Sequence, residues 1–448
     1  MFLFSSIYWA VLTPPITQPE LIWLLLGEKM AEGNLMFKDI LDDTGPFSAT
    51  VYWLLHLVFG KSHLVHKIFA GLIIFIQISY INHLFNQYKS FEESSYIPAF
   101  VSVILVHASF DLLCLSPALM GSTFILLALG QLFSQTVLQK EGSDSVLLTG
   151  IFSGIALCFH FPLIFFLPYM LFMGIIISGF SLRQLFLSLA GYALPFLICC
   201  TYYFWQDALP DFINKYVLTS RDLDIYIHVR LRDIIILYAA PVLFSFLGIV
   251  LGSVIKSLTV NQQKQLQLML LFFVFAVASF VLTNRRAPYQ FIILIPPFTY
   301  FVSMLFLALR KKNLANAMST AFLIMVPLIG FSWLLVKTIQ GRLDTYGVFI
   351  EEKHQVAKNK KVLVLDEDIA YYQLGRQTSP YLNFYLAKDI ILKSNDPKNI
   401  ALASKHLLKD LPELVVDGEG VFEVFLDKTP LIKAKYRKEG SYFYLTDK

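Results

Sequence analysis

The stretch TQPELIWLLLGEKMAEGNLMFKDILDDTGPF, residues 17–47, decides how the whole chain is interpreted. It follows a short apolar segment and carries six carboxylates: Glu20, Glu28, Glu32, Asp39, Asp42 and Asp43. The chain has 448 residues, of which 56% are hydrophobic and 15% charged, and its mean hydropathy is +0.62. Such a composition is too apolar for a soluble globular protein. We therefore predict an all-α, polytopic membrane protein in which residues 17–47 belong to a loop outside the hydrocarbon layer.

A membrane-spanning helix needs about 20 predominantly apolar residues. Ten segments fit this pattern, near residues 64–84, 95–112, 117–136, 147–160, 161–178, 184–205, 232–256, 265–283, 289–309 and 318–337. The sequence CFHFP, residues 158–162, divides two of them because it places a histidine and a helix breaker at a tight bend. Residues 1–13 are too short to span, so either the chain starts upstream or this segment is half of a span. Counting it gives eleven spans.

The orientation depends on residues 45–60, GPFSATVYWLLHLVFG. Short cytoplasmic loops are enriched in Lys and Arg. If residues 45–60 lie in the membrane surface, the cytoplasmic loops carry Lys89, Lys140, Arg183, Lys256, Lys264 and the basic run 310–312. If they span, the first three of these cations fall outside. We interpret the segment as interfacial, which places the loop 14–63, the loop 206–231 and the loop at 285–286 outside the cytoplasm.

The amino-acid composition changes after the last predicted span, from mainly apolar to mixed polar and apolar. KKVLVLDED (360–368), PELVVDGEG (412–420) and GSYFYLTD (440–447) are typical of short strands, and NIALASKHLLKDL (399–411) is typical of a helix. We predict a transmembrane domain over residues 1–340 and a small soluble α/β domain over residues 341–448, on the extracytoplasmic side of a cytoplasmic (inner) membrane.

Charge and cysteine usage narrow the function classes. The net charge is +4, and no dense basic run could follow a phosphate backbone, which argues against a nucleic-acid partner. The four cysteines lie in or beside apolar stretches, without the spacing of a zinc site or a disulfide framework: Cys114, Cys158, Cys199 and Cys200.

Local preferences give a simple interpretation of the acidic loop. Thr17 and Glu20 match a capping box, so we expect a helix from about Pro19 to Glu32 that ends at Gly33 and lies in the membrane surface. On this interpretation Glu20 only caps the helix, and the DDTGP sequence at 42–46 only makes a turn.

The order of these elements resembles the GT-C membrane glycosyltransferases, particularly the aminoarabinose-transferase and protein O-mannosyltransferase branch. The likeness lies in the Glu-led interfacial helix, the Asp-rich turn, the Pro-led aromatic helix ending VFGKS (58–62), and Lys67 where that family has an Arg. It continues in LLTGIFSGIALCFHFPLIFFLPY (147–169) and NRRAPYQFIILIPP (284–297). The resemblance implies transfer of a sugar from a polyprenyl phosphate to a glycan, lipid or protein acceptor on the extracytoplasmic face of the membrane.

Such a transfer requires a base for the acceptor and cations for the leaving phosphate. The resemblance makes Glu20 the base or the partner of the base. It assigns the lipid phosphate to Lys67, Arg285, Arg286 and His160, the last of which stands where the family has a Lys. On this hypothesis Glu20 faces a cavity that is also lined by the turn 39–43 and by Arg285 or Arg286.

The sequence also departs from the family pattern. Pro19 replaces an Asp beside Glu20, and Asp39, Asp42 or Asp43 could substitute, with Asp42 favoured because it is close to the following helix. Ser116 stands where the family often has an acid, although Asp111 is near. These departures leave open a different donor or acceptor, or a non-catalytic subunit that binds a lipid or a partner protein. A divalent metal assists some members of the family, but no metal site is fixed by this sequence. We expect Glu28 and Glu32 to face water.

The predicted topology can be tested with fusions. Alkaline phosphatase fused after Lys448 should be active, and a fluorescent protein that folds only in the cytoplasm should be dark at the same position. The reverse pattern would overturn the topology and, with it, the site in the first loop.

Overall fold

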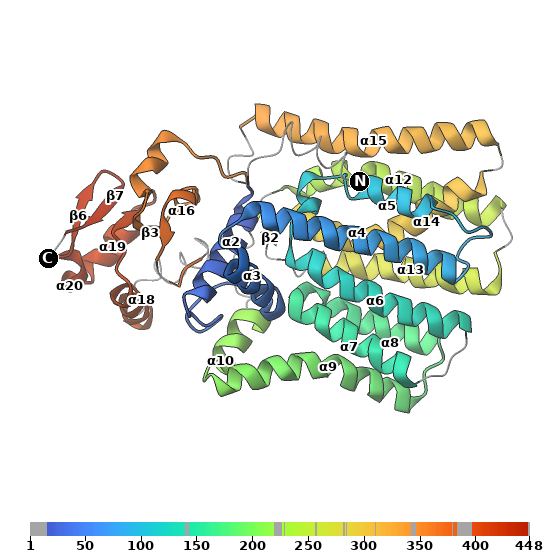
Figure 1. Ribbon diagram of the computed structural model, residues 1–448, viewed down its shortest axis with the longest axis horizontal. Coiled ribbons are helices and arrows are strands. Elements are labelled where there is room, and N and C mark those ends of the chain that lie inside the picture. Colours follow the sequence, from blue (N-terminus) through green and yellow to red (C-terminus); the bar gives the residue numbers. More distant parts are fainter. Residues whose placement is uncertain are drawn as a thin grey trace.

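The computed structural model shows a long helical bundle with a small α/β domain at one end (Figure 1). The predicted fold class is thereby confirmed. The structure describes residues 16–138, 143–218, 226–227, 229–255, 258–280, 283, 285–309, 311–341, 346–378, 380–382 and 397–446. The first apolar segment, residues 1–13, lies outside these ranges.

Six helices among the described residues are long and apolar enough to cross a membrane: α4 (His63–Gln87), α6 (Pro117–Leu138), α9 (Leu182–Trp205), α12 (Leu231–Ile255), η5 with α14 (Pro288–Leu294 and Ile295–Ala308) and α15 (Lys312–Ile339). The bundle also contains α7 (Ser143–Phe159), η2 (Phe161–Phe165), α8 (Phe166–Ile176) and α13 (Val260–Ser279). Three of the shorter apolar helices cover residues 46–59, 143–159 and 161–176. Ten of the eleven predicted spans thus correspond to helices of unequal length, and the eleventh, residues 1–13, lies outside the described residues.

Two predicted spans show how local sequence sets helix ends. The break at CFHFP is confirmed, because α7 ends at Phe159 and η2 begins after His160 with a proline in its first turn. The expected span 95–112 was too long: α5 covers only Ile97–Leu105, and the chain then turns into η1 (Phe110–Leu113). This early end has a polar cause, since η1 contains Asp111, whose carboxylate accepts a hydrogen bond from the backbone of η5.

Small residues let α7 and α9 approach each other closely. A Cβ atom at Gly150 would lie 2.1 Å from the backbone oxygen of Ser188, and one at Gly154 would lie 2.2 Å from that of Tyr192. Real Cβ atoms essentially never come so near, so only glycine fits at these positions. Close backbone contact of this kind stabilises helix pairs in lipid, where the hydrophobic effect between helices is absent.

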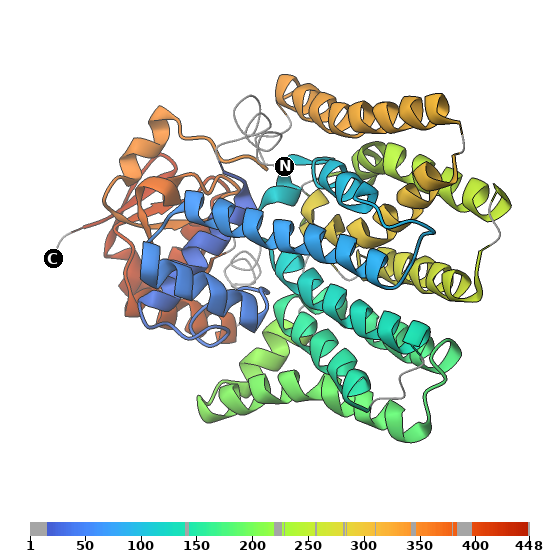
Figure 2. The ribbon, with the colours of Figure 1, turned by 45° about the vertical axis from the view of Figure 1, so that its right-hand side comes forward.

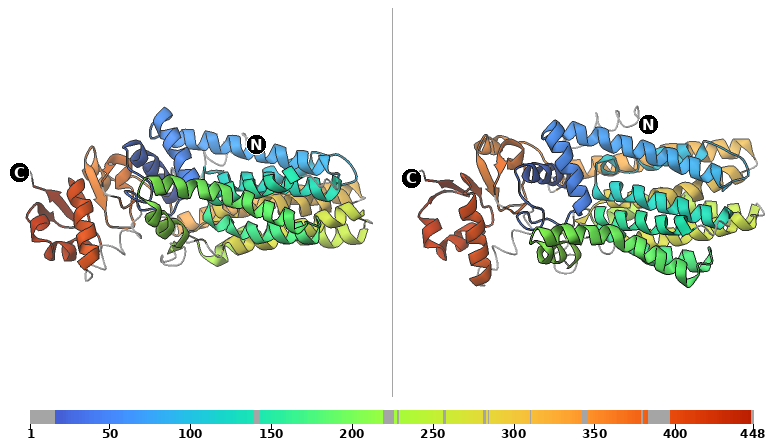
Figure 3. Two further views of the ribbon diagram at one scale, coloured as in Figure 1. Left: turned by 90° about the horizontal axis from the view of Figure 1, so that it is seen from below. Right: turned by 60° about the horizontal axis from the view of Figure 1, so that its bottom comes forward.

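The helix α3 (Pro46–Phe59) runs across the direction of the bundle helices (Figure 3), as an interfacial helix would. The ends of other helices hold it in place. Ser48 Oγ donates to the carbonyl of Phe159 at 2.9 Å, and Tyr52 Oη donates to the carbonyl of Leu115 at 2.6 Å. At Gly45, a Cβ atom would lie 2.3 Å from the same Phe159 carbonyl oxygen. The first loop is therefore built onto one end of the bundle, here called the domain end.

The C-terminal domain contains a five-stranded sheet in the order β4-β3-β5-β7-β6. The strands are β3 (Lys361–Val364), β4 (Arg376–Gln377), β5 (Leu414–Val416), β6 (Tyr436–Glu439) and β7 (Tyr442–Leu445). β4, β3 and β5 are parallel, whereas β7 is antiparallel to both β5 and β6. The accompanying helices are η6 (Glu352–Ala357), α16 (Tyr371–Leu374), α18 (Pro397–Lys409), α19 (Val421–Asp427) and α20 (Pro430–Lys433). The three predicted strands and the predicted helix are confirmed.

We predict that the contact between α7 and α9 is required for a stable bundle. Gly154→Leu should lower the melting temperature of the purified protein by several degrees, because overpacking at a closed site costs about 1–3 kcal/mol. Ala317→Leu is the matched control, since Ala317 is exposed on α15 and has room for the larger side chain. Melting is monitored by size-exclusion chromatography with fluorescence detection after heating. Equal melting temperatures for the two variants would contradict this prediction.

Candidate functional site

Glu20 lies in α2 (Gln18–Ala31) at the domain end of the bundle, and the predicted capping box is confirmed. The N–H and O–H groups of Thr17 both donate to Glu20 Oε2 at 2.9 Å. The other carboxylate oxygen lies 3.0 Å from His63 Nε2, at the start of α4. Burial raises the pKa of Glu20, but the hydrogen bond and charge of His63 and the backbone N–H of Thr17 outweigh burial and lower it to about 2. Glu20 is therefore ionised at neutral pH.

Aromatic rings enclose this pair. Trp23 stacks on Tyr52 with ring centroids 5.8 Å apart, and the edge of Tyr289 meets Trp23 at 5.4 Å. Tyr52 in turn stacks on His66 at 5.4 Å. These rings come from α2, α3, α4 and η5, so four separate segments surround the carboxylate. His63 could not be predicted as the partner of Glu20 from local sequence, because the two residues are 43 positions apart.

A second buried acid lies near this cluster. Asp111 is 2% exposed and accepts hydrogen bonds from Ser109 Oγ at 2.6 Å, the backbone N–H of Tyr289 at 3.0 Å and Tyr346 Oη at 2.7 Å. Burial raises its pKa to about 6, against the opposing effect of these donors. Asp111 therefore joins η1 and η5 to Tyr346, which lies between α15 and the C-terminal domain.

The acids of the predicted turn have other partners. Asp42 is 1% exposed and accepts from both the backbone and the hydroxyl of Thr44. Asp39 accepts from the backbone N–H of Leu35 at 3.0 Å and faces Lys409 of the C-terminal domain at 3.2 Å. Asp43 is half-buried. The contacts described for Glu20 thus come from α2 and α4, whereas those of Asp39 and Asp42 come from their own loop and the domain.

The expectation that Glu28 and Glu32 face water was wrong for Glu28, which is half-buried, whereas Glu32 is exposed. Glu28 lies 2.9 Å from Lys61 Nζ in the turn between α3 and α4, and the side chain of Glu28 is 19% exposed. Glu32 pairs with Arg376 of the C-terminal domain at 2.8 Å. The physical reason for the difference at Glu28 is that it is half-buried beside the turn between α3 and α4, where a carboxylate needs a partner in place of water.

The predicted phosphate-binding cations lie at the same end of the bundle. Lys67 is one turn after His63 in α4, and its charge contributes to the low pKa of Glu20. His160 links α7 to η2. Arg285 and Arg286 form the short strand β2, which pairs in parallel with β1 (Tyr226–Ile227). The side chain of Arg285 is outside the description, so the structure leaves the predicted role of this pair untested.

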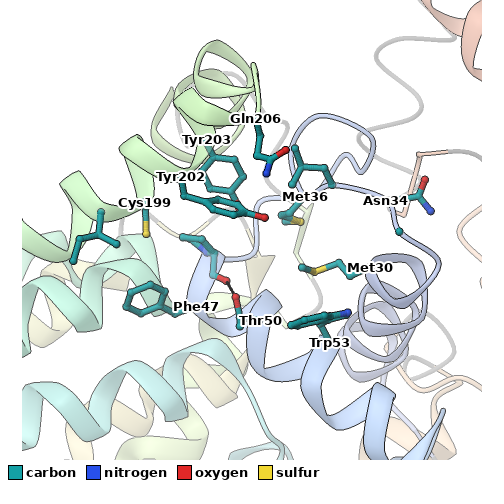
Figure 4. Close-up of a pocket in the computed structure, with 14 residues that line it drawn as sticks. Met30, Asn34, Met36, Phe47, Thr50, Trp53, Cys199, Tyr202, Tyr203 and Gln206 are labelled. Carbon is teal, nitrogen blue, oxygen red and sulfur yellow. Dashed lines mark hydrogen bonds between the residues drawn. The ribbon is translucent and has the colours of Figure 1, made fainter.

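An open cleft of about 680 Å³ lies between the first loop and the end of α9. Figure 4 shows Trp53 from α3, Tyr202 and Tyr203 from α9, and Met30 and Met36 from the first loop turned toward this space. A further groove of about 630 Å³ continues along α9 and shares Ile198 and Tyr202 with the cleft. The sequence analysis missed the cleft, because its walls come from segments about 150 positions apart.

The chemistry of the cleft suits a long apolar molecule with a polar end. Its walls are mainly apolar and aromatic, and the groove along α9 is lined by Ala, Leu, Ile, Thr and Tyr. Polar groups gather at the loop side, where Asn34 and Gln206 line the cleft and Lys38 Nζ donates to the Gln206 carbonyl at 2.8 Å. Among the described residues no three His, Cys, Asp or Glu side chains are placed to hold a metal ion.

No protein-family model matches this sequence, and no curated protein is similar to it. Solved structures are similar in fold. The crystal structure of ArnT from Cupriavidus metallidurans bound to undecaprenyl phosphate is 12% identical, with a TM-score of 0.57, and the match covers 99% of this chain and 97% of that one. The apo form of ArnT matches with a TM-score of 0.53 at 11% identity, over 96% and 93% of the two chains.

The oligosaccharyltransferase of Archaeoglobus fulgidus, tethered to an acceptor peptide, matches with a TM-score of 0.51 at 11% identity. This match covers 100% of the present chain and 73% of the archaeal one. Both enzymes are GT-C glycosyltransferases, and at these identities the likeness concerns the fold. The resemblance seen in the sequence is confirmed, and the protein has the fold of a divergent GT-C-like membrane protein.

Proposed function

We propose that this protein is a glycosyltransferase that takes a sugar from a polyprenyl-phosphate carrier and passes it to an acceptor on the extracytoplasmic face of the cytoplasmic membrane. The observation that carries the proposal is the apolar cleft at the first loop, which continues into the groove along α9. ArnT, whose fold this chain shares, was crystallised with undecaprenyl phosphate, and the archaeal enzyme with a dolichol phosphate.

The cleft supplies a path for the lipid. A polyprenyl chain that enters between α9 and the bilayer would lie against Leu194 and Ile198, and would end against Trp53 and Tyr203. Its phosphate would then be at the loop side, where negative charge needs cations. Lys67, Arg285, Arg286 and His160 are the cations proposed from the sequence. Lys38, which donates to the carbonyl of the cleft residue Gln206, is a further candidate.

The geometry favours Glu20 as the partner of the base. A carboxylate with a pKa of about 2 is a weak proton acceptor at neutral pH, because a base works best when its pKa is near the working pH. The imidazole of His63, 3.0 Å from this carboxylate, is the other group of the pair that can accept a proton. If Nε2–H donates to Glu20, the imidazole is fixed in the tautomer whose Nδ1 accepts a proton from an acceptor hydroxyl. On this proposal Asp39 and Asp42 have a structural role, because their hydrogen bonds to Leu35 and Thr44 hold the first loop in place.

A second candidate function is a non-catalytic subunit that binds a polyprenyl phosphate or a partner protein. The observation in its favour is that both oxygens of Glu20 are engaged by Thr17 and His63. Pro19 and Ser116 also stand where the family has acids. Such a protein would bind the lipid in the same cleft without consuming a lipid-linked sugar.

We predict that Glu20 and His63 act as one unit in transfer. The purified protein is placed in nanodiscs with undecaprenyl phosphate carrying a radiolabelled sugar, and the loss of label from the lipid fraction is measured with membrane extract as acceptor. Glu20→Gln and His63→Gln should each slow transfer by roughly 10²-fold, the scale of a lost general base. The double variant should be no slower than either single one, because the effects of coupled residues do not add.

Glu28→Gln is the control for this experiment. Glu28 lies on the same helix as Glu20, and the substitution removes its ion pair with Lys61 of the α3–α4 turn. Transfer should be nearly unchanged. Full activity of well-folded Glu20→Gln protein would refute the assignment of the base. If the wild type is stabilised by undecaprenyl phosphate but consumes none of a panel of lipid-linked sugars, the subunit function replaces the enzyme.

The ionised state of Glu20 predicts an acid-sensitive fold. The pKa of Glu20 falls from 4.5 to about 2 on folding. The contribution of this carboxylate to the free energy of unfolding is therefore fully present above pH 4.5 and is lost as the pH falls toward 2. That contribution is roughly 3 kcal/mol. At pH 7 the melting temperature of the Glu20→Gln variant should be lower than that of the wild type, and at pH 3 the difference between the two melting temperatures should be smaller. Parallel melting curves across this range would show that the carboxylate is not held ionised by the fold.

A further inference from the structure

A second groove, of about 620 Å³, lies between α12 and α15. The helices α15 and α9 lie at opposite edges of the bundle (Figures 1 and 2), so this groove is remote from the cleft described above. It contains residues from the start of α12 and the last third of α15, which both lie at the domain end. Neither the sequence analysis nor the proposed transfer reaction uses it.

The size of the groove matches one leaflet of a bilayer. The residues that α15 contributes run from Leu328 to Gln340. At 1.5 Å per residue this segment is about 18 Å long, close to the roughly 15 Å of hydrocarbon in one leaflet. The part deeper in the bundle is apolar, with Leu328, Ile329 and Ile236 on its walls. Polar and charged side chains appear only toward Gln340, which is where a headgroup would lie.

The described residues at the mouth of the groove include two cations and one carboxylate. Lys337 Nζ lies 2.7 Å from Asp233 Oδ2, and the side chains are only 11% and 5% exposed. This buried pair is neutral as a whole, and Lys337 also lies 5.9 Å above the ring of Trp333. Arg232, which lines the mouth and is exposed, adds the remaining charge. Charged residues within membrane helices are costly and commonly mark functional sites.

We propose that this groove binds one anionic glycerophospholipid from the leaflet on the side of the C-terminal domain. An acyl chain would lie along Leu328 and Ile329, and the phosphate would be held by Arg232 and by Lys337, which Asp233 keeps in position. Arg suits this role because its planar guanidinium forms paired hydrogen bonds with phosphate oxygens. The lipid would anchor α15, the helix that leads into the C-terminal domain.

Native mass spectrometry of the full chain tests this proposal, with phosphatidylglycerol and phosphatidylcholine of identical acyl chains as probes. The wild type should retain one phosphatidylglycerol and bind it about tenfold more tightly than phosphatidylcholine. Arg232→Gln should abolish this preference, because it removes the cation at the mouth that forms no ion pair within the described part of the chain. Ile329→Trp should weaken both lipids by filling the apolar part of the groove.

Two matched controls accompany these variants. Arg230→Gln removes the same charge two positions away, outside the groove, and Ile324→Trp adds the same ring at a position on α15 that is 55% exposed. Both should bind phosphatidylglycerol like the wild type. All four variants should first show an unchanged melting temperature without lipid, which separates lost binding from lost folding.

Three results would overturn the proposal. The first is equal binding of phosphatidylglycerol by the wild type, Arg232→Gln and Ile329→Trp. The second is displacement of phosphatidylglycerol by an equal amount of undecaprenyl phosphate, which would make the groove a second carrier-lipid site. The third is high-yield disulfide formation between cysteines introduced at Ser332 and Ala10, which would show that the chain itself fills the groove.

Discussion

A carboxylate that is buried at the edge of a hydrocarbon layer needs a hydrogen-bond or ion-pair partner, because its charged form loses its hydration and is otherwise destabilised. The domain end of this bundle is arranged around that constraint. Glu20 is held by Thr17 and His63, and Asp111 by groups from η1, η5 and Tyr346. Glu20 therefore joins the start of α2 to the start of α4, and Asp111 joins η1 to η5 and to Tyr346.

The same constraint explains the position of the C-terminal domain. The backbone N–H of Gln18 donates to the carbonyl of Tyr346 at 2.8 Å, and that of Leu41 donates to the carbonyl of Pro380 at 2.8 Å. Ion pairs of Glu32 with Arg376 and of Asp39 with Lys409 add to these contacts. Exposed pairs contribute little individually. Together with the backbone contacts they dock the domain on the first loop, beside the cleft that faces α9.

Local sequence was sufficient for the features that depend on neighbouring residues. The capping box at Thr17, the break at His160 and the strands of the tail could all be predicted, because each is determined within a few positions. The pairing of Glu20 with His63 and of Asp111 with Tyr346 could not, since those residues are 43 and 235 positions apart. The same holds for Glu28 and Glu32, whose partners come from the α3–α4 turn and the C-terminal domain. The fold was recognised from the order of elements along the chain, which survives when sequence identity is about 12%.

The proposed function requires a polyprenyl phosphate in the cleft between the first loop and α9, with its phosphate near the cations of the domain end. Electron cryomicroscopy of the protein in nanodiscs that contain undecaprenyl phosphate tests this most directly. The account predicts continuous density along α9 that ends between Trp53 and Tyr203. Ordered lipid density elsewhere on the bundle with an empty cleft, at saturating undecaprenyl phosphate, would contradict it.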